Sequence, residues 1–395
     1  MKKGWQTKTL GEICEIERGG SPRPIQSFIT TDPNGINWIK IGDATASGKY
    51  IYKTEEKIRP EGVKRSRMVY EGDFILSNSM SFGRPYIMKT TGCIHDGWLV
   101  LHQPKVDPDY LYHVLSSDLV FNQFDRLAAG STVRNLNIGL AKSVEIPYPP
   151  LPEQQRIVGI LDEAFDGIAI AKANAKKNLH NARALFESHL QSVFARLSDE
   201  VQLSELASEI TDGDHSPPPK ASTGVPFITI SDIVKSTRQV DFSNTFMVPA
   251  EYFQKLKPNK KPKVGDILYT VTGATLGIPV LVKEQRDFCF QRHIGLVRPK
   301  PDTDSAWLSY ALLSPQLFSQ ATIGSTGAAQ KTVSLSVLRS LKVPKVALPE
   351  QKRIAAQLDS TAAQTQRLSS IYQQKLAVLD ELKKSLLHQA FSGEL

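Results

Sequence analysis

Two long segments of the chain place apolar residues at alternating spacings of three and four positions. Such a stripe, sustained over several heptads, predicts an amphipathic helix with a coiled-coil seam. Each predicted helix runs about 40 residues, or about 60 Å. Polar residues interrupt the stripes at Asn178 and Lys375. The predicted seam positions are Ile157, Leu161, Ala164, Ile168, Ala171, Ala175, Ala182 and Leu185 in the first helix, and Ile354, Leu358, Thr361, Thr365, Leu368, Tyr372, Leu379, Leu382 and Leu386 in the second.

The same Leu-Pro-Glu-Gln motif opens both helices, beginning at Leu151 and at Leu348. Proline is tolerated in the first turn of a helix, and the glutamate complements the positive end of the helix dipole. Another segment repeats as well: Glu71–Leu76 matches Val264–Tyr269 at an offset of 193 residues, whereas the helix openings match at 197. The chain is therefore a duplicated module, a globular segment followed by a long helix. Its period is far longer than that of a solenoid repeat.

The two globular segments carry short apolar runs bounded by Gly, Pro, Ser and Thr, a pattern that predicts strands. Helical spacing predicts one short helix in each segment as well. Each segment is thus α+β, with long irregular loops of the kind that often carry binding function. The predicted strands are Ile36–Ile41, Asp73–Leu76 and Gly97–Leu101 in the first segment and Phe227–Ile230, Asp266–Val271 and Ile294–Val297 in the second, and the predicted short helices are Asp109–Leu115 and Ala306–Leu313.

These patterns divide the chain into a globular domain at 1–151, a helix at 152–197, a second domain at 198–348 and a second helix at 349–395. One such helix alone would expose its seam, but two helices in one chain can bury each other. Because the first helix must return the chain to a second domain, we predict an antiparallel pair. The predicted fold is α+β: two globular domains related by pseudo-twofold symmetry and separated by two long antiparallel coiled-coil helices. Duplex DNA offers a matching symmetry.

The composition, with 41% hydrophobic and 22% charged residues, is ordinary for a soluble globular protein. The sequence lacks the roughly 18-residue apolar run of a membrane span, and residues 1–6 do not look like a signal peptide. Three widely separated cysteines argue against a disulfide framework or a zinc site and predict a cytoplasmic location. The net charge is +8, with +3 on each globular segment. That excess fits phosphate contacts, and it equally fits a slightly basic soluble protein.

The sequence carries no familiar catalytic signature: no phosphate loop, no His/Cys metal-ligand spacing, no nucleophile elbow and no dinucleotide-binding glycine pattern. Glu55 and Lys57, after Asp32, are faintly similar to a metal-dependent nuclease pattern. Such a triplet is common by chance, and the second segment has no equivalent. His95 and His293 fall at roughly equivalent places in the two segments, where either a DNA contact or a structural role is open.

The repeated junctions at Ile146–Ile157 and Val343–Ile354 carry a resemblance to a known family. The Gly-Asp strands that begin at Gly72 and Gly265, and the C-terminal Phe391–Leu395, match as well. In these features the chain resembles the specificity subunit of a type I restriction-modification system. The resemblance covers essentially the whole chain and is weaker within the globular segments, which vary in that family.

The resemblance implies that each globular domain is a target recognition domain reading one half of a split sequence in double-stranded DNA. The helices would set the spacing and dock DNA methyltransferase (modification) subunits. S-adenosylmethionine, ATP and Mg²⁺ would be bound by partner subunits, and this chain would hold no cofactor and catalyse nothing. A motor-nuclease (restriction) subunit using ATP would join for cleavage, and the sequence leaves open whether this system has one.

Polar loop residues are the candidates for DNA contact, because arginine can read guanine and asparagine or glutamine can read adenine. Loops are polar in most proteins, so we expect about half of the candidates to touch DNA. No metal ligands are predicted among them. The candidates are Arg18, Ser21, Arg23, Asn78, Ser79, Arg84, Ser131, Thr132, Arg134 and Asn135 in the first domain and Asp214, His215, Lys220, Thr270, Thr272, Thr275, Arg292, Ser325, Thr326, Gln330 and Lys331 in the second.

Two other functions remain open at this point. One is a metal-dependent nuclease fragment acting through Glu55 and Lys57, which DNA cleavage by the isolated chain would support. The other is a duplicated coiled-coil scaffold without a nucleic-acid role, which the absence of salt-dependent DNA binding by the complete assembly would support.

Overall fold

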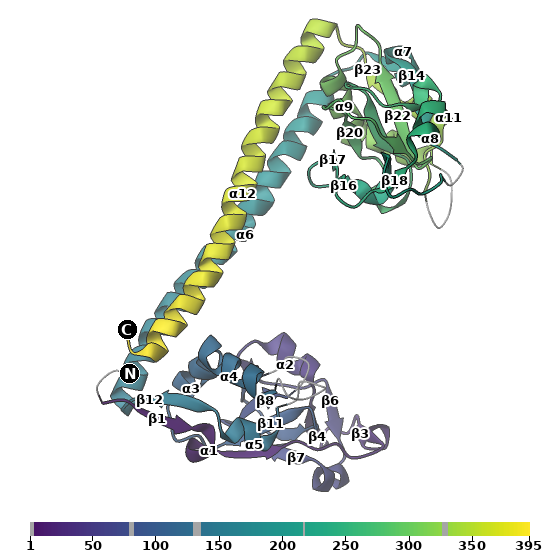
Figure 1. The fold of residues 1–395 in the computed structure, drawn as a ribbon. Helices are drawn as coiled ribbons and strands as arrows, with labels where there is room; N and C mark the ends of the chain where they lie inside the picture. Colours follow the sequence, from purple (N-terminus) through teal and green to yellow (C-terminus); the bar gives the residue numbers. More distant parts are fainter. Residues whose placement is uncertain (1–3, 79–82, 129–135, 216–217, 326–330) are drawn as a thin grey trace. The chain divides into compact units, whose positions relative to one another are not determined.

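The computed structural model describes residues 4–78, 83–128, 136–215, 218–325 and 331–395. The chain forms two compact units, residues 1–176 with 374–395 and residues 177–373. Each unit therefore combines one globular domain with part of each long helix, α6 (Leu151–Phe194) and α12 (Leu348–Ser392) (Figure 1). None of the described helices is both long and apolar enough to cross a membrane.

In the described residues of domain 1, a main sheet has the strand order β2-β11-β8-β9-β5 and a second sheet the order β3-β6-β4-β10-β7. A short antiparallel pair, β1 and β12, lies at the start of α6. The elements are β1 (Gln6–Thr9), α1 (Leu10–Ile13), β2 (Glu15–Arg18), β3 (Ile29–Thr30), β4 (Ile36–Ile39), α2 (Ile41–Ser47), β5 (Tyr50–Ile51), β6 (Glu56–Ile58), β7 (Arg67–Val69), β8 (Phe74–Ser77), β9 (Pro85–Met88), β10 (Gly92–Ile94), β11 (Trp98–His102), α3 (Pro108–Leu115), α4 (Asp118–Ala128), α5 (Ile138–Lys142) and β12 (Glu145–Tyr148).

Domain 2 repeats this plan in its described residues. Its main sheet has the order β14-β22-β19-β20, its second sheet the order β18-β15-β21, and β13 pairs with β23 next to α12. The elements are β13 (Glu200–Gln202), α7 (Leu203–Leu206), β14 (Ala207–Asp212), β15 (Val225–Ile228), β16 (Ile233–Val234), β17 (Gln239–Val240), β18 (Phe246–Val248), α8 (Ala250–Lys255), β19 (Ile267–Thr270), β20 (Pro279–Leu281), β21 (Cys289–Phe290), β22 (Ile294–Pro299), α9 (Ser305–Leu313), α10 (Pro315–Ile323), α11 (Leu335–Ser340) and β23 (Lys342–Pro344).

The predicted strands and short helices are confirmed, with two corrections at strand ends. The strand predicted at Ile36–Ile41 stops at Ile39, and Ile41 begins α2. The strand predicted at Phe227–Ile230 stops at Ile228, and Ile230 begins a short 3-10 helix. In both places an aspartate lies three residues beyond the last extended residue and accepts the backbone N–H of that residue. This hydrogen bond begins a helical turn. A run of apolar residues does not indicate it.

The repeated Gly-Asp motif marks a turn that enters the central strand of each main sheet. Gly72 and Gly265 have positive φ angles of 92° and 90°, a conformation that strongly favours glycine. The next residue, Asp73 or Asp266, is buried and accepts the backbone N–H three residues earlier at 2.8 Å. The motif therefore recurs because the same turn is built twice.

The glutamine of each Leu-Pro-Glu-Gln motif ties the long helix to its domain. Buried Gln154 accepts from the backbone N–H of Asp107 at 2.8 Å and donates to the carbonyl of Pro149 at 2.8 Å. Gln351 makes the equivalent bonds, to Asp304 and to the carbonyl of Val346, both at 2.7 Å. Since Asp107 and Asp304 are the N-caps of α3 and α9, one side chain joins the starts of two helices.

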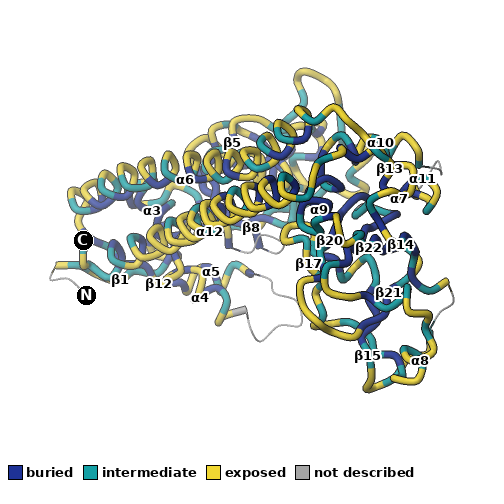
Figure 2. The backbone as a smooth tube through the Cα atoms, turned by 90° about the horizontal axis from the view of Figure 1, so that it is seen from above, coloured by how far each residue is buried: buried dark blue, intermediate teal, exposed yellow. Residues whose placement is uncertain are grey.

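The two long helices pack against each other in an antiparallel arrangement within each unit. In the first unit, Lys172 of α6 pairs with Asp380 near the end of α12. In the second, His189 near the end of α6 lies 3.3 Å from Gln357 near the start of α12. Exposed positions dominate along both helices, whereas buried positions gather on strands such as β8 and β22 (Figure 2). The predicted antiparallel pairing is thus confirmed.

Three predicted seam positions are wrong. Leu185, Leu368 and Leu382 are 55%, 38% and 44% exposed. In two of these places the next residue turns inward instead: Phe186 packs on the core of domain 2, and Ser369 is buried. A straight helix drifts by about 20° per heptad relative to a strict seven-residue repeat. Over a helix of this length, a stripe of apolar residues chosen from the sequence therefore rotates away from the surface that contacts the partner helix.

Each domain packs on the start of one helix and the end of the other. In domain 1, Ile157 and Leu161 from the start of α6 join a core that also holds Phe391 from the end of α12. In domain 2, Leu358 from the start of α12 joins Phe194 from the end of α6. Burying each of these side chains stabilises the fold by roughly 1.5–3 kcal/mol, so the helices are part of the domain cores.

Candidate nucleic-acid interface

In domain 1, two chain segments cross where the first predicted DNA-contact loop leaves β2. The backbone N–H of Gly19 donates to the carbonyl of Trp98 at 2.9 Å, and that of Gly20 donates to the carbonyl of Ile94 at 3.1 Å. A Cβ on Gly19 would lie 2.0 Å from the carbonyl oxygen of His95. Only glycine allows this approach, so the Gly-Gly pair fixes the loop against the turn between β10 and β11.

Asp96, in that turn, gathers four of the predicted contact residues. Its carbonyl accepts from Nε of Arg18 at 3.2 Å and from Nδ2 of Asn78 at 2.8 Å. Its carboxylate accepts from the hydroxyl of Ser21 at 2.8 Å and lies 3.6 Å from Nη2 of Arg23. The Ser21 hydrogen bond is the main cause that holds the pKa of the Asp96 carboxyl below its ordinary value. The structure therefore brings Arg18, Ser21, Arg23 and Asn78 together.

Beside this turn lies an open cavity of about 760 Å³ that belongs to domain 1. Ser21, Arg23, Lys40 and His95 supply its polar side chains, and Trp38 is among its apolar ones. Nδ1 of His95 accepts from the backbone N–H of Gly97 at 2.9 Å, and burial lowers the pKa of the imidazole. His95 is therefore a structural histidine of the turn, uncharged at neutral pH, whereas Arg23 and Lys40 supply positive charge.

Domain 2 builds the same crossing. The backbone N–H of Gly213 donates to the carbonyl of Ile294 at 3.2 Å, and that of Asp214 donates to the carbonyl of Phe290 at 3.0 Å. A Cβ on Gly213 would lie 2.0 Å from the carbonyl oxygen of Phe290. The backbone N–H of Arg292 donates to the carbonyl of Asp214 at 3.0 Å, so Asp214 and Arg292, both predicted contacts, are joined.

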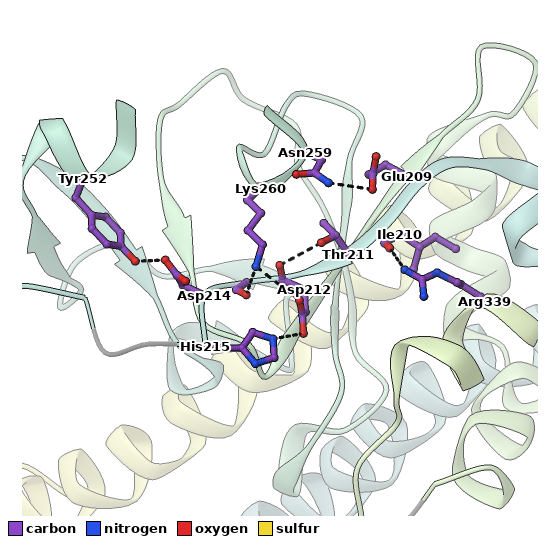
Figure 3. Close-up of polar contacts among 11 residues, drawn as sticks. Glu209, Ile210, Thr211, Asp212, Asp214, His215, Tyr252, Asn259, Lys260 and Arg339 are labelled. Atoms are coloured by element: carbon purple, nitrogen blue, oxygen red, sulfur yellow. Dashed lines mark hydrogen bonds and ion pairs between the residues drawn. The ribbon is translucent and has the colours of Figure 1, made fainter. Parts of the chain in front are cut away.

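A polar network supports this loop of domain 2 (Figure 3). Tyr252 of α8 donates to the carboxylate of Asp214, and Nζ of Lys260 donates to the carbonyl of Gly213 at 2.8 Å. Nε2 of His215 lies 2.7 Å from Asp212, and the His215 side chain is 61% exposed. The Asp214 carboxylate is thus engaged within the domain, while the imidazole of His215 faces solvent.

The structure separates the other predicted contacts by exposure. Asn78, Thr270 and Thr272 are buried; Thr270 bonds the carbonyl of Thr275 and accepts from the N–H of Ile278, and Thr272 bonds Thr332. Ser325 donates to the carbonyl of Thr322 at 2.6 Å, and Thr275 is partly buried. The exposed predicted contacts are Arg18, Arg23, Arg84, His215, Lys220, Arg292 and Lys331. Ser79, Ser131, Thr132, Arg134, Asn135, Thr326 and Gln330 lie outside the described residues.

Sequence reasoning missed Asp96, Tyr252 and Lys260. The candidates were taken from the Gly-rich and polar loops on either side of the predicted strands, and the turn that holds Asp96 was not among those loops. Tyr252 and Lys260 lie 38 and 47 residues from the loop they support, as the separations in their hydrogen bonds show, and no local pattern marks such a pairing. The usable signal was the His-Asp-Gly turn at 95–97, directly before the apolar strand β11.

The nuclease alternative finds no support in the described residues. Nζ of Lys57 donates to the carbonyl of Pro33 at 2.7 Å, and Glu56 pairs with Lys40. The described part of the chain contains no group of three His, Cys, Asp or Glu side chains arranged to hold a metal ion.

Two copies of one domain plan, each carrying the same loop crossing and followed by one of two paired helices, define a protein with two related recognition domains. A model of the type I restriction modification DNA specificity domain matches residues 2–181 and again 200–376. The chain belongs to this family. It is a type I restriction-modification specificity subunit, the component that recognises DNA and is not itself an enzyme.

Relatives match along the whole length. The chain is 25% identical to the putative type I restriction enzyme MjaX specificity subunit of Methanocaldococcus jannaschii, covering 100% of this chain and 94% of the relative. It is 23% identical to the EcoBI specificity subunit of Escherichia coli, covering 99% and 86%. It shares the fold of the HsdS subunit of Thermoanaerobacter tengcongensis, with 21% identity, a TM-score of 0.64 and coverage of 100% and 98%.

A second solved structure, described as showing complex assembly and conformational transition of the type I R-M system, has a TM-score of 0.81 at 22% identity and covers 100% of this chain and 99% of that one. These likenesses support the α+β architecture with two domains and two long helices. They give no support to the scaffold and nuclease alternatives.

Proposed function

We propose that each globular domain reads one half of a bipartite sequence in double-stranded DNA. The observation that carries this proposal is the repeated loop crossing: Gly19 and Gly213 make equivalent backbone bonds, yet the loops they anchor present different side chains. A constant backbone frame with different exposed groups suits two different half-sites. The exposed arginines and lysines of each domain supply phosphate and base contacts, since arginine can pair with guanine and either cation can pair with phosphate.

Buried Asn78, Thr270 and Thr272 hold the loops in place, and direct contact falls to the exposed residues around them. Arg84 and Lys220 lie over the rings of Tyr86 and Phe246, with 5.2 Å from the charged group to the ring centroid in each case. Stacking of this kind orders long side chains and leaves their outer donors available.

The long helices set the distance between the half-sites and dock DNA methyltransferase (modification) subunits, which bind S-adenosylmethionine. A motor-nuclease (restriction) subunit with ATP and Mg²⁺ joins for cleavage where the system has one, and the assembly works in the cytoplasm. Support comes from family membership and from the solved structure of a type I R-M assembly with the same fold. The chain carries no cofactor of its own in this scheme.

The test is an exchange of domain 1, residues 1–151, for the matching domain of a relative, followed by sequencing of methylated bases in cells that lack the native gene. We expect one half of the methylated motif to change while the other half and the spacer stay the same. The reciprocal exchange of residues 198–348 should change only the other half. An exchange that altered both halves, or neither, would contradict the proposal.

A further inference from the structure

One turn occupies the same place in both domains and shares two of its backbone hydrogen bonds. It comprises residues 95–97, between β10 and β11, and residues 291–293, between β21 and β22. The N–H of the residue after each turn donates to the carbonyl of the first turn residue, at 3.1 Å for Trp98 and 3.0 Å for Ile294. The carbonyl of the third turn residue accepts a hydrogen bond at 3.0 Å from a backbone N–H at the end of the strand that follows the Gly-Asp motif. The donor is Asn78 in domain 1 and Val271 in domain 2. We call these the paired turns.

The middle residues of the paired turns have opposite charges: Asp96 in domain 1 and Arg292 in domain 2. The Asp96 side chain is 49% exposed and the Arg292 residue is exposed. Two matching backbone hydrogen bonds hold this position in both domains, while its side chain is acidic in one domain and basic in the other. Such a difference suits the recognition of two different half-sites.

The side chains at the paired turns have hydrogen-bonding capacity left. The backbone carbonyl of Asp96, not its carboxylate, holds Arg18 and Asn78, so the side chain is not needed for those two bonds. Its carboxylate accepts one hydrogen bond, from Ser21, whereas two carboxylate oxygens offer about four acceptor sites. The backbone N–H of Arg292 donates to the carbonyl of Asp214, and the Arg292 residue is exposed, with no ion pair to another described residue.

The charge around Asp96 makes an acidic group acceptable at a DNA surface. A lone carboxylate would be repelled by phosphates, but Arg18 and Arg23 both contact Asp96, so the local group carries a net positive charge. Carboxylates accept a hydrogen bond from the amino group of cytosine, whereas arginine donates two hydrogen bonds to guanine. Each choice distinguishes one base pair in the major groove.

We propose that Asp96 and Arg292 are specificity-determining residues. Asp96 accepts a hydrogen bond from a cytosine amino group in the half-site of domain 1, and Arg292 pairs with a guanine in the half-site of domain 2. The inference rests on the proposed function, in which each domain reads one half-site. It adds the position in each domain that selects a particular base.

The test uses the full chain assembled with its modification subunits, and the readout is the methylated motif determined by sequencing. Asp96→Asn keeps an acceptor for Ser21 but removes the charge, and Asn pairs with adenine. We expect one position of one half-site to change its preference from cytosine to adenine, by roughly 5- to 150-fold. Arg292→Gln should change one guanine of the other half-site to adenine, while Arg292→Lys keeps guanine.

Matched controls separate a reading role from a general charge effect. Asp32→Asn in domain 1 and Arg286→Gln in domain 2 make the same chemical changes at exposed residues away from the paired turns. Both should leave the motif unchanged. Thermal melting of each variant checks that the fold is kept, and competition binding of the complex to duplexes with single base changes measures specificity if methylation is weak.

The outcomes distinguish this inference from the proposed function. If Asp96→Asn and Arg292→Gln bind and methylate with the original motif, or bind all sequences equally weakly, the paired turns do not select bases and the inference is overturned while the half-site assignment stands. If either variant alters both half-sites, the assignment of one domain to each half fails. A change confined to one position of one half-site supports both.

Discussion

The two domains agree in the side chains that bond to backbone and differ in the side chains that bond to carboxylates. Gln123 exchanges two hydrogen bonds with the backbone of Glu145 in domain 1, and Gln320 does the same with the backbone of Lys342 in domain 2. Gln154 and Gln351 show the same agreement at the helix openings. The backbone N–H and carbonyl occupy the same positions in both domains. Only a side chain with a donor and an acceptor at the right distance can bond to both, so glutamine appears in each domain.

Carboxylates accept a wider range of partners. Buried Asp73 lies 2.8 Å from Nδ1 of His102, whereas its counterpart Asp266 pairs with Arg298 at 2.8 Å. On the long helices, Asp162 of α6 lies 2.8 Å from His113, whereas Asp359 of α12 accepts from the hydroxyl of Tyr310 at 2.6 Å.

A carboxylate has several acceptor directions, so any donor that reaches it can serve. The comparison teaches that the duplicated fold is maintained by its backbone bonds, while the partners of its acidic groups are free to diverge.

The largest effect is expected where the two domains bury equivalent leucines of the long helices. Leu161→Asp in domain 1 and Leu358→Asp in domain 2 each place an unpaired charge in a core where the leucine is 0% exposed. Each should lower the free energy of unfolding by several kcal/mol. Chemical denaturation measures the loss. Ile170→Asp, at a 64% exposed position of the same α6 helix, is the control and should cost little. Wild-type stability of both core variants would disprove the shared packing.

The next effect tests whether the glutamine ties are equivalent. Gln154→Leu leaves the backbone N–H of Asp107 and the carbonyl of Pro149 without their hydrogen-bond partner. Gln351→Leu does the same to the corresponding pair in domain 2. Each buried group left unsatisfied costs about 1–3 kcal/mol, so the two variants should lose similar stability. Gln155→Leu, an exposed neighbour, should be nearly neutral. Markedly unequal losses in thermal denaturation would show that the ties differ in role.

A smaller effect should distinguish the domains by pH. Burial lowers the pKa of His113 below the ordinary value of about 6.5. Folding therefore favours the neutral imidazole. The resulting contribution to the free energy of unfolding is fully present above about pH 6.5 and is lost as the pH falls through the lower pKa of the folded state. Burial instead raises the pKa of Tyr310 to about 12, so the equivalent group of domain 2 stays neutral throughout. Domain 1 should lose more stability than domain 2 on acidification.

Hydrogen exchange, expressed as protection factors at pH 7.5 and 5.5, measures this difference domain by domain. His113→Tyr copies domain 2 and should reduce the acid sensitivity of domain 1. His180→Tyr, at an exposed position of α6, should leave it unchanged. Equal acid sensitivity of the two domains in the unaltered chain would contradict the expectation.

The smallest change concerns the spacing. Insertion of four residues, one helical turn, after Lys176 in α6 and after Gln373 in α12 lengthens each helix by about 6 Å, close to two base-pair steps of about 3.4 Å. The seam stays nearly in phase. We expect the unread spacer of the methylated motif to grow by one or two base pairs with both half-sites unchanged. An active variant with the original spacer would show that the helices do not set the distance.

Much of the fold could be predicted from the sequence because its signals are local and occur twice. The Leu-Pro-Glu-Gln openings, the Gly-Asp turns and the three-and-four spacing each depend on neighbours within a few residues, and duplication at offsets of 193 and 197 confirmed each signal with a second copy. Helix phase was the exception. Leu185 and Leu382 are apolar yet exposed. Which residues of a 44- or 45-residue helix face its partner depends on a small angular drift per turn, and the sequence does not show this drift.

The sequence by itself determined the class of the protein, its duplicated plan and the general location of its candidate DNA-contact loops. Only the tertiary structure decided which polar residues in those loops are exposed. Asn78 and Thr270 were predicted to contact DNA, but their hydrogen bonds are made within the protein interior. Asp96 was not predicted at all, and the structure gathers Arg18, Ser21 and Arg23 around it. Polar character is a property of the residue, whereas availability depends on partners that arrive from distant parts of the chain.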